Sequence, residues 1–298
     1  MNSHNKQPLV SIIIPTYNSE RFIANSVVSA LNQTYPNIEI LIIDDGSTDK
    51  TETVIQKLPD SIRYIKQVNS GPSSARNHGI MQSNGEYIAF LDVDDEWMPS
   101  KIDKQVSLFE SNQNLSITAT SYIRCDADLL PIETTALNIP SKEKGIIPFR
   151  MLLEKNQLLT SSIMTKKNIL DRCGFFDEEI QFGEDWDLWV RIAQLGEIGY
   201  IHTPLCKYRV HGAGLTGKLD DKNMQDWLKV IKKNRLRSNS WYDRHVTYRK
   251  SYSWYLHNYA YLERVRGQKA EGKKKALKSM ITWPFTTRVL RIVKGLFI

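Results

Sequence analysis

Three carboxylates follow a short apolar run near the middle of the chain. Residues 87–91 are apolar, and Asp92, Asp94 and Asp95 come directly after them. A run of this length and composition is typical of a strand that is buried on both faces. Carboxylates crowded at the end of such a strand repel one another, and a divalent cation would relieve the repulsion. We therefore interpret Asp92 and Asp94 as parts of a site for a metal ion and a diphosphate, and Asp95 as a helix cap.

Strands and helices alternate through the first part of the chain and would position these carboxylates. Strands are predicted over residues 9–14, 39–43, 62–66 and 86–91, with a helix after each of the first three. We expect Pro15 to end the first strand, because proline cannot donate a hydrogen bond to a sheet ladder. This alternation is typical of an α/β fold with helices on both faces of a parallel sheet.

The carboxyl ends of parallel strands joined by right-handed crossovers meet at one rim of the sheet, where open α/β folds bind their ligands. Ser73 or Ser74 is expected to cap the helix that precedes the last of these strands. The residues expected at the rim are Tyr17, Asp45, Arg76, Asp92 and Asp94.

The rest of the chain is less regular. Helices are predicted at 101–111, at 149–154 and from 183 to 195, and strands at 116–124, 161–165 and 205–211. Residues 126–147 show little periodicity and are expected to form a loop. We divide the chain into a main α/β region, residues 1–218, and a helical C-terminal region, residues 219–298.

Composition and charge narrow the classes of protein. The 298 residues are 41% hydrophobic and 24% charged, which is ordinary for a globular protein. The net charge of +7 is concentrated in residues 263–298, which hold ten Lys or Arg and two Glu, so the basic surplus belongs to the tail rather than to the main body. We expect no nucleic-acid partner. Cys125, Cys173 and Cys206 are widely spaced, which favours reduced thiols over a disulfide framework. We predict no transmembrane helix, because no apolar run reaches ~20 residues.

Six segments, in their order and spacing, resemble the family 2 glycosyltransferases, which have the GT-A fold. The segments are SIIIPTYN at 11–18, LNQTYPNIEILIIDDGSTD at 31–49, GPSSARNHGI at 71–80, GEYIAFLDVDDEW at 85–97, GEDWDLWVR at 183–191 and YRVHGAGLT at 208–216. The resemblance covers about residues 8–215. It implies a GT-A domain over residues 1–218, in which about 1–100 bind the nucleotide sugar and 101–218 bind the acceptor.

The resemblance implies a nucleotide-diphosphate-sugar donor, a divalent metal ion (Mn²⁺ or Mg²⁺) and transfer with inversion at the anomeric carbon. The family positions that hold the base correspond to Tyr17, which would stack on uracil, and to Asp45, which would accept the base N3–H. Pro15 and Thr16 are counted in the same nucleotide-sugar site. Packing against a helix is the structural alternative for Tyr17.

The resemblance also implies roles for residues that contact the phosphates and the metal. Arg76 would lie near the diphosphate, whose geometry suits a guanidinium, and its alternative is a surface arginine. Asp92 would reach the ribose or donor sugar, and Asp94 would bind the metal. His211 matches a region that supplies a further metal or phosphate contact, and its alternative is a hydrogen-bonded structural histidine.

The resemblance places the catalytic base at Asp185, because an inverting transfer needs one base to deprotonate the acceptor hydroxyl. Glu184 is assigned to the nucleotide-sugar site, and both Glu184 and Asp187 are secondary candidates for the base. Capping of the following helix is the structural alternative for Asp185. Trp186 and Trp189 are expected in the core or in a wall rather than as platforms for a sugar.

We therefore expect a metal-dependent inverting glycosyltransferase that moves a sugar from a UDP-sugar to a surface polysaccharide or a lipid-linked oligosaccharide. A nucleotidyltransferase of sugar phosphates is one alternative, but the loop at residues 15–18 has neither the glycine nor the lysine that hold a triphosphate. A non-catalytic scaffold that binds sugar nucleotides is another, and it would be expected to lack Asp94 or Asp185.

The tail, residues 263–298, combines many basic side chains with apolar residues at helical spacing from Phe285 onward. This pattern is typical of a helix that lies on an anionic membrane surface. We therefore expect a cytoplasmic protein that associates peripherally with the inner face of the cell membrane. The same pattern also fits packing of the helix on the protein itself or on a second subunit of a homo-oligomer.

Overall fold

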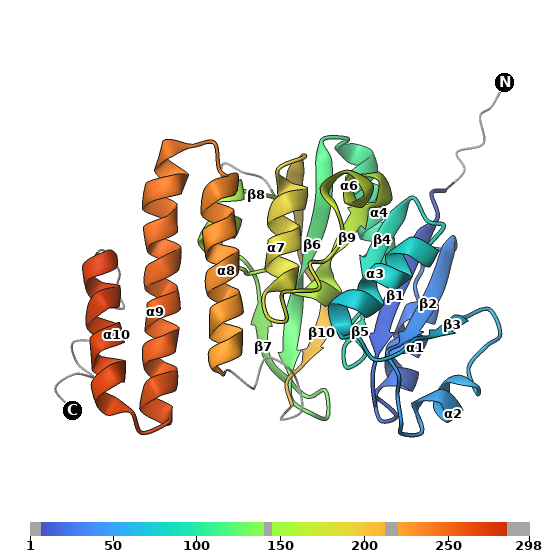
Figure 1. Cartoon of the computed structure of the whole chain (residues 1–298). Helices are drawn as coiled ribbons and strands as arrows, with labels where there is room; N and C mark the ends of the chain where they lie inside the picture. Colours follow the sequence, from blue (N-terminus) through green and yellow to red (C-terminus); the bar gives the residue numbers. More distant parts are fainter. Residues whose placement is uncertain (1–6, 140–144, 212–219, 285–298) are drawn as a thin grey trace. The chain divides into compact units, whose positions relative to one another are not determined.

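The structure is a computed structural model, and it describes residues 7–139, 145–211 and 220–284 (Figure 1). The chain divides into two compact units. The first comprises Met1–Phe149, Gln157–Glu179 and Arg191–Ala213, and the second comprises Arg150–Asn156, Ile180–Val190 and Gly214–Ile298. The boundary predicted at residue 218 lies in segment 212–219, outside the described residues.

The described part of the first unit contains a ten-stranded sheet in the order β3-β2-β1-β4-β9-β6-β10-β5, with β7 on β6 and β8 on β10. Its strands are β1 (Val10–Thr16), β2 (Ile38–Asp44), β3 (Arg63–Lys66), β4 (Tyr87–Phe90), β5 (Glu96–Trp97), β6 (Leu115–Cys125), β7 (Pro131–Thr135), β8 (Ile146–Ile147), β9 (Met164–Lys166) and β10 (Glu197–Arg209). Strands β3, β2, β1 and β4 are parallel, as predicted. Strand β9 is antiparallel to both β4 and β6 and joins the two parts of the sheet.

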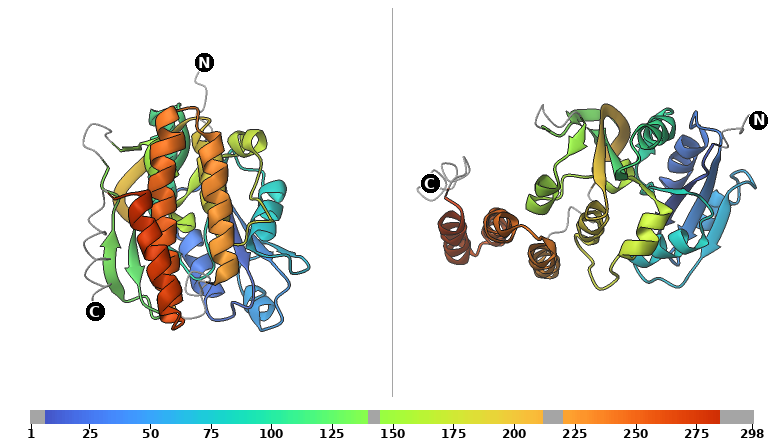
Figure 2. Two further views of the ribbon diagram at one scale, coloured as in Figure 1. Left: turned by 60° about the vertical axis from the view of Figure 1, so that its left-hand side comes forward. Right: turned by 90° about the horizontal axis from the view of Figure 1, so that it is seen from above.

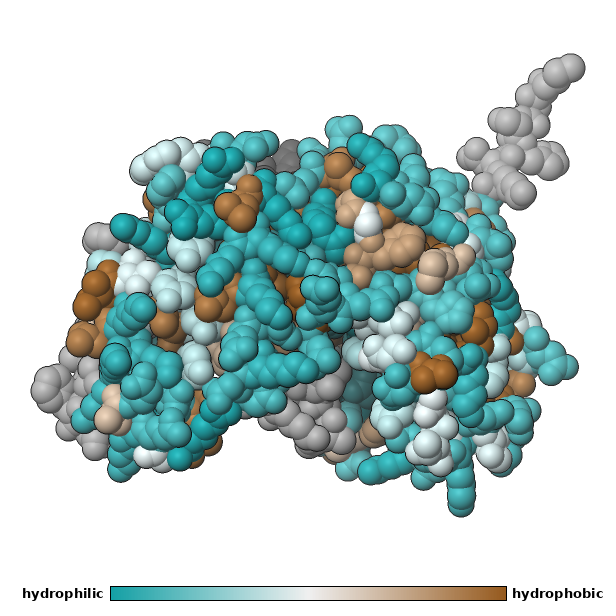
Figure 3. All heavy atoms as spheres, in the orientation of Figure 1, coloured by the Kyte–Doolittle hydropathy of each residue, from teal (hydrophilic) through white to brown (hydrophobic). Residues whose placement is uncertain are grey.

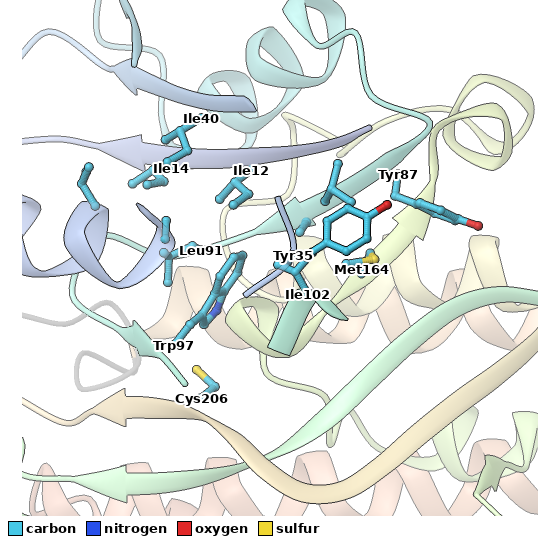
Figure 4. Close-up of a cluster of buried hydrophobic side chains, with 14 of the residues drawn as sticks. Ile12, Ile14, Tyr35, Ile40, Tyr87, Leu91, Trp97, Ile102, Met164 and Cys206 are labelled. Carbon is cyan, nitrogen blue, oxygen red and sulfur yellow. The ribbon is translucent and has the colours of Figure 1, made fainter. Parts of the chain in front are cut away.

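Helices cover both faces of this sheet (Figures 1 and 2). They are α1 (Ile23–Leu31), α2 (Thr51–Ile55), α3 (Pro72–Gln82), α4 (Lys101–Ser111) and α6 (Lys167–Cys173). Because side chains alternate along a strand, Ile12 and Ile14 share one face and pack in the core cluster with Leu91 and with residues of α1 and α4 (Figure 4). On the other face, α3 approaches β1 so closely that a Cβ on Gly79 would lie 2.5 Å from Cγ2 of Ile13.

The expectation that Pro15 ends the first strand is wrong, because β1 continues through Pro15 to Thr16. Pro15 pairs with Ile43 of β2. The carbonyl of Ile13 accepts a hydrogen bond from the N–H of Leu91, and the pairing of β1 with β4 ends at Ile13. Backbone groups two residues apart in a strand point the same way, so the missing N–H of Pro15 faces the space beyond the end of the β1–β4 ladder.

Other local expectations also differ from the structure. Segment 126–147, predicted as a loop, contains β7 and β8, while α6 was not predicted. The helix that carries Arg76 begins at Pro72 after Gly71, and neither Ser73 nor Ser74 caps it, since proline suits the first helical position. By contrast, α4 and α5 (Phe149–Glu154) match the predicted ranges.

The second unit is helical. Its helices α8 (Asp221–Arg237), α9 (Tyr248–Val265) and α10 (Lys269–Thr282) lie side by side (Figures 1 and 2). The unit also includes most of α5 and the first part of α7 (Glu184–Ala193). Trp227 of α8 meets Trp254 of α9 edge to face, and the hydroxyls of Ser253 and Ser279 lie 2.9 Å apart between α9 and α10. Helix α10 therefore packs on the chain itself. The amphipathic segment predicted from Phe285 lies outside the described residues.

Within the described ranges, no helix combines the length and the apolar composition that crossing a membrane requires.

Candidate active site

The loops that follow β1, β2 and β4 lie at one rim of the parallel strands. Strand β1 ends at Thr16 beside Asp44 of β2, and β4 ends beside the middle of β1. This arrangement is the one predicted from the alternation of strands and helices. The predicted site residues that follow the three strands are Tyr17, Asp45 and Asp92.

Arg76 of α3 reaches this rim and pairs with the first carboxylate. Its Nη2 lies 2.7 Å from Oδ1 of Asp92, and its guanidinium lies over the ring of Phe176, 5.4 Å from the centroid. Arg76 is buried, so it is not the exposed helix arginine that was its alternative. Helix α3 carries Arg76 to this place because it packs tightly on β1. The result is a buried guanidinium with a fixed orientation at the end of β4.

Asp94 and His211 form a second pair beside the first. Nε2 of His211 lies 2.9 Å from Oδ2 of Asp94, and its ring packs against Phe22 with centroids 5.0 Å apart. Burial and the neighbouring charge of Asp92 raise the pKa of Asp94, and the contact with His211 partly offsets this increase. A carboxylate whose charged form is penalised in this way is stabilised by an added cation.

The Asp94–His211 pair suits a divalent ion that keeps part of its coordination for a substrate. Among the described residues, no group of three His, Cys, Asp or Glu side chains is arranged to hold a metal. Mg²⁺ typically takes one or two protein carboxylates together with water and phosphate oxygens, and an imidazole is a suitable ligand for Mn²⁺. Asp94 and His211 therefore fit an ion bound jointly with a diphosphate.

Asp95 is a buried brace rather than the helix cap that was expected. Its Oδ2 accepts a hydrogen bond of 2.5 Å from the Ser161 hydroxyl, which also accepts one of 3.0 Å from the N–H of Asp92. Its Oδ1 accepts the N–H of Arg209 at 3.0 Å. Burial, together with the charges of Asp94 and Asp92, raises the pKa of Asp95 well above its usual value. Asp95 thus ties the turn at residues 92–95 to two distant segments.

Arg209, which ends β10, is a second site residue that sequence reasoning did not assign. Its Nε donates to the carbonyl of Asp94 at 2.8 Å, its Nη1 donates to that of Ala127 at 2.6 Å, and its Nη2 lies 3.8 Å from Glu96. The side chain is buried. The available signal was its place two residues before His211, at the end of a predicted strand.

Asp45 organises the loop before α3. Its Oδ1 accepts hydrogen bonds from Gln67 Nε2 and from the N–H of Ser70, and its Oδ2 accepts the N–H of Gly71, each at 2.8 Å. Oδ2 keeps the capacity to accept another donor. The neighbouring Tyr17 is half exposed and available to a ligand.

Pro15 and Thr16 are buried at the end of β1, directly before Tyr17. They therefore fix the point at which the first loop leaves the sheet. The loop is tied further by Asn18, whose Oδ1 accepts the N–H of Thr48 at 2.8 Å.

Glu184 and Asp185 belong to the second unit, where they open helix α7. Oδ2 of Asp185 accepts a hydrogen bond of 3.0 Å from Asn156 Nδ2, and its Oδ1 accepts the N–H of Trp186 at 2.6 Å. Both acids are partly exposed. The first unit therefore brings together Arg76, Asp92, Asp94 and His211, whereas the predicted base is positioned by another set of contacts.

Residues 186–190, which follow in this motif, are buried. Asp187 is buried and pairs with Arg237 of α8, with 2.7 Å between Oδ1 and Nη1. Trp186 and Trp189 are fully buried, and Trp186 Nε1 donates to the carbonyl of Leu152 at 2.6 Å. The two tryptophans thus lie in the core, as expected, and a carboxylate engaged with an arginine is a poor candidate for the base.

Comparison with known sequences gives one consistent family. The sequence model described as Glycosyl transferase family 2 matches residues 11–172. An uncharacterized glycosyltransferase of Rickettsia typhi is 36% identical over 226 residues, covering 72% of this chain and 68% of that protein. The chain spans only 36% of a longer uncharacterized glycosyltransferase of Rickettsia felis, to which it is 32% identical.

Solved structures share the fold. S. aureus TarS 1–349 in complex with UDP-GlcNAc matches with a TM-score of 0.63 at 16% identity, over 91% of this chain and 88% of that one. The mannosyltransferase PcManGT of Pyrobaculum calidifontis, in complex with GDP-Man and Mn²⁺, also has a TM-score of 0.63 at 16% identity, over 98% of this chain and 80% of that one. The predicted GT-A fold is thereby confirmed.

Proposed function

This chain belongs to glycosyl transferase family 2, and we propose that it transfers a sugar, with inversion, from a UDP-sugar to a glycan or lipid-linked oligosaccharide in surface polysaccharide synthesis. One observation carries the proposal: the Asp94–His211 pair lies beside the Arg76–Asp92 pair at the end of β4. Together they offer a cation site and a guanidinium to the same diphosphate. The likeness to structures that hold UDP-GlcNAc and GDP-Man supports a nucleotide-sugar donor.

Asp94 and His211 would hold Mn²⁺ or Mg²⁺, which supplies Lewis-acid stabilisation of the leaving diphosphate. Arg76 would bind a phosphate oxygen, since its guanidinium is buried, oriented and supported by the ring of Phe176. Asp92, fixed by Arg76 and Ser161, would bind a hydroxyl of the ribose or of the donor sugar.

The nucleobase would lie over the first two loops of the rim. Tyr17 offers a half-exposed ring for stacking, and Asp45 offers Oδ2 to the base N3–H. Pro15 and Thr16, at the end of β1, would position the start of the loop that carries Tyr17. Because Asp45 also holds the loop at residues 67–71, its contacts link base binding to the start of the helix that carries Arg76.

Asp185 would act as the base. Asn156 and the N–H of Trp186 hold its carboxylate in the first turn of α7. In that role Asp185 accepts the proton of the acceptor hydroxyl as the hydroxyl oxygen attacks the anomeric carbon. Glu184, which precedes it, would contact the donor.

The test is a panel of sugar nucleotides incubated with the protein and with Mn²⁺, Mg²⁺ or EDTA. We expect slow hydrolysis of one UDP-sugar that releases UDP, is lost in EDTA, and is lost in Asp94→Ala but not in the exposed control Asp103→Ala. Formation of pyrophosphate would favour a nucleotidyltransferase of sugar phosphates. Tight binding without turnover, in the presence of acceptor extracts, would favour a scaffold. Full activity of metal-depleted Asp94→Ala would exclude the metal assignment.

We also propose that the protein works at the inner face of the cell membrane, attached peripherally, because residues 263–298 carry a local charge of +8 and a lipid-linked acceptor would lie there.

A further inference from the structure

Exposed apolar and aromatic side chains gather where α8 ends and the next helix begins. Leu236, Trp241 and Tyr242 expose 78%, 69% and 39% of their surface. Trp227, by contrast, is buried and meets Trp254 edge to face. A single exposed Leu needs no explanation, but three large exposed apolar or aromatic side chains within seven residues indicate an interaction surface. We call residues 229–250 the α8–α9 corner.

The backbone of the α8–α9 corner is fixed by its own hydrogen bonds. Nε of Arg235 donates to the carbonyl of Arg244 at 3.1 Å, and Nε of Arg244 donates to that of Ser238 at 2.5 Å. The ring of Trp241 stacks on His245 with centroids 4.7 Å apart. The aromatic side chains are therefore presented by an ordered turn rather than by a loose loop.

The corner is strongly basic. Residues 229–250 hold eight Lys or Arg and one acid, Asp243, so their formal charge of +7 equals that of the whole chain. Asp243 is buried and engaged by Arg150 and Thr247. Three of the basic residues pair with acids outside the segment, namely Lys229 with Asp226, Arg237 with Asp187 and Lys250 with Glu154. Lys232, Arg235, Arg244 and Arg249 are exposed. The exposed positive side chains match a partner that carries many negative charges.

The end of α10 lies at this same end of the unit. Nζ of Lys250, at the start of α9, lies over the ring of Trp283, 5.5 Å from its centroid. Figures 1 and 2 show α10 running antiparallel to α9, toward the corner. The described chain therefore stops near the corner, and fourteen further residues with Arg288, Arg291 and Lys294 follow it in the sequence. Figure 3 shows that hydrophilic residues cover most of the surface over the three helices, with a few apolar patches among them.

We propose that the α8–α9 corner docks on the headgroups of an anionic lipid surface. Trp and Tyr favour the headgroup level, Leu236 would enter the outer acyl region, and each Lys or Arg near such a surface adds about 1 kcal/mol. A neutral glycan would stack on the aromatic rings, but it would not account for the basic side chains. A nucleic acid would pair with the basic side chains, but it would not account for the exposed Leu236. This proposal depends on the proposed function in one respect only, namely that the protein works at a membrane.

The test is co-sedimentation of the full chain with vesicles of phosphatidylcholine, alone or mixed with phosphatidylglycerol, at low and high salt. One variant removes apolar contact (Leu236→Ser with Trp241→Ser), and a second reverses charge (Lys232→Glu with Arg249→Glu). Tyr261→Ser with Val265→Ser, at the other end of α9, and Lys222→Glu, at the start of α8, are matched exposed controls. Circular dichroism checks folding.

We expect binding only to vesicles with phosphatidylglycerol, weaker at high salt, and lowered about 10–100-fold by the charge-reversed variant. The apolar variant is expected to lose binding more at high salt, and the controls to bind as the parent does. Equal binding of corner and control variants, binding that ignores anionic lipid, or capture by RNA in preference to vesicles would overturn the proposal. Donor hydrolysis is measured on every variant. Its loss throughout, with docking intact, would overturn the enzymatic proposal alone.

Discussion

Two of the segments in which three acids fall within four residues belong to the predicted site, and they differ in how those acids are accommodated. The first segment follows β4 and holds Asp92, Asp94 and Asp95, and the second opens α7 and holds Glu184, Asp185 and Asp187. In the first, the backbone is irregular, and cationic or polar side chains from distant elements hold each acid. In the second, a helix spaces the acids and its terminus supplies N–H groups and a favourable dipole.

This difference means that the first segment favours binding of a cation, whereas the second does not. The pKa values of Asp94 and Asp95 are raised by burial and by the neighbouring acids, so this cluster gains from an added positive charge. In α7 the only buried acid is Asp187, and Arg237 already neutralises it. Similar composition therefore gives a candidate metal site in one place and a candidate base beside a structural ion pair in the other.

The largest effect on turnover is expected from Asp185→Asn. The amide keeps the shape and can still accept the N–H of Trp186, but it cannot accept a proton, so kcat should fall about 10²–10⁴-fold with donor affinity unchanged. Turnover with acceptor and donor binding by calorimetry measure the two quantities, with exposed Asp171→Asn as control. If the variant unfolds, or if it binds donor poorly while kcat stays normal, Asp185 is a helix cap. Glu184 would then be tested as the base.

Asp187→Ala should instead change stability. Removing it leaves the partly buried Arg237 without its carboxylate, at a cost of about 3 kcal/mol in the free energy of unfolding. Urea unfolding measures the loss, and kcat per folded molecule should stay unchanged. The double variant Asp187→Ala with Arg237→Met should recover part of the loss, because no charge is then stranded. A large fall in kcat with stability intact would show that both acids of this turn serve the reaction.

Ser161→Ala tests the brace of the first segment. It removes the hydroxyl that joins the N–H of Asp92 to the carboxylate of Asp95, so the turn should lose its fixed geometry. We expect about a tenfold weaker apparent affinity for Mn²⁺, in the range seen for residues that orient metal ligands. Ser162→Ala is the matched control, because that hydroxyl donates to the carbonyl of Leu159 instead. Equal Mn²⁺ titrations for the two variants would remove Ser161 and Asp95 from the site.

The last prediction concerns a buried basic group, Lys101. Burial lowers the pKa of Lys101 to about 7, and its Nζ donates to Gln105 Oε1 at 2.7 Å. The pKa of Lys101 is higher in the unfolded chain, so near pH 7 the unfolded chain binds the proton more tightly and folding is disfavoured. The free energy of unfolding should therefore rise as the pH increases toward the pKa of the unfolded state. The gain in the free energy of unfolding between pH 7 and 9 should be about 2 kcal/mol. In Lys101→Met that part of the pH dependence should vanish, and unchanged pH profiles by urea unfolding would contradict the assignment.

Sequence patterns predicted the parallel strands and the rim, because buried strands are apolar runs and polar residues mark their ends. They placed α4 and α5 correctly, since both helices show a clear apolar stripe. They missed the first half of β10, because the exposed His202 and Thr203 interrupt the buried positions in the middle of this long strand and hide its periodicity. The roles of Asp95 and Arg209 were missed as well, because hydrogen bonds to Ser161 and to the carbonyl of Asp94 arise only from tertiary contact.

The long-range contacts that hold the first acid segment also affect the order in which the site folds. The contacts of Asp92 with Ser161, of Asp95 with Arg209 and of Asp94 with His211 join residues that are 69, 114 and 117 positions apart in the chain. Contacts of such separation form late in folding, because a long loop must close first. A chain emerging from the ribosome therefore makes its parallel strands and their acids well before the groups that restrain them. The turn at residues 92–95 gains its final shape only when β10 has been synthesised.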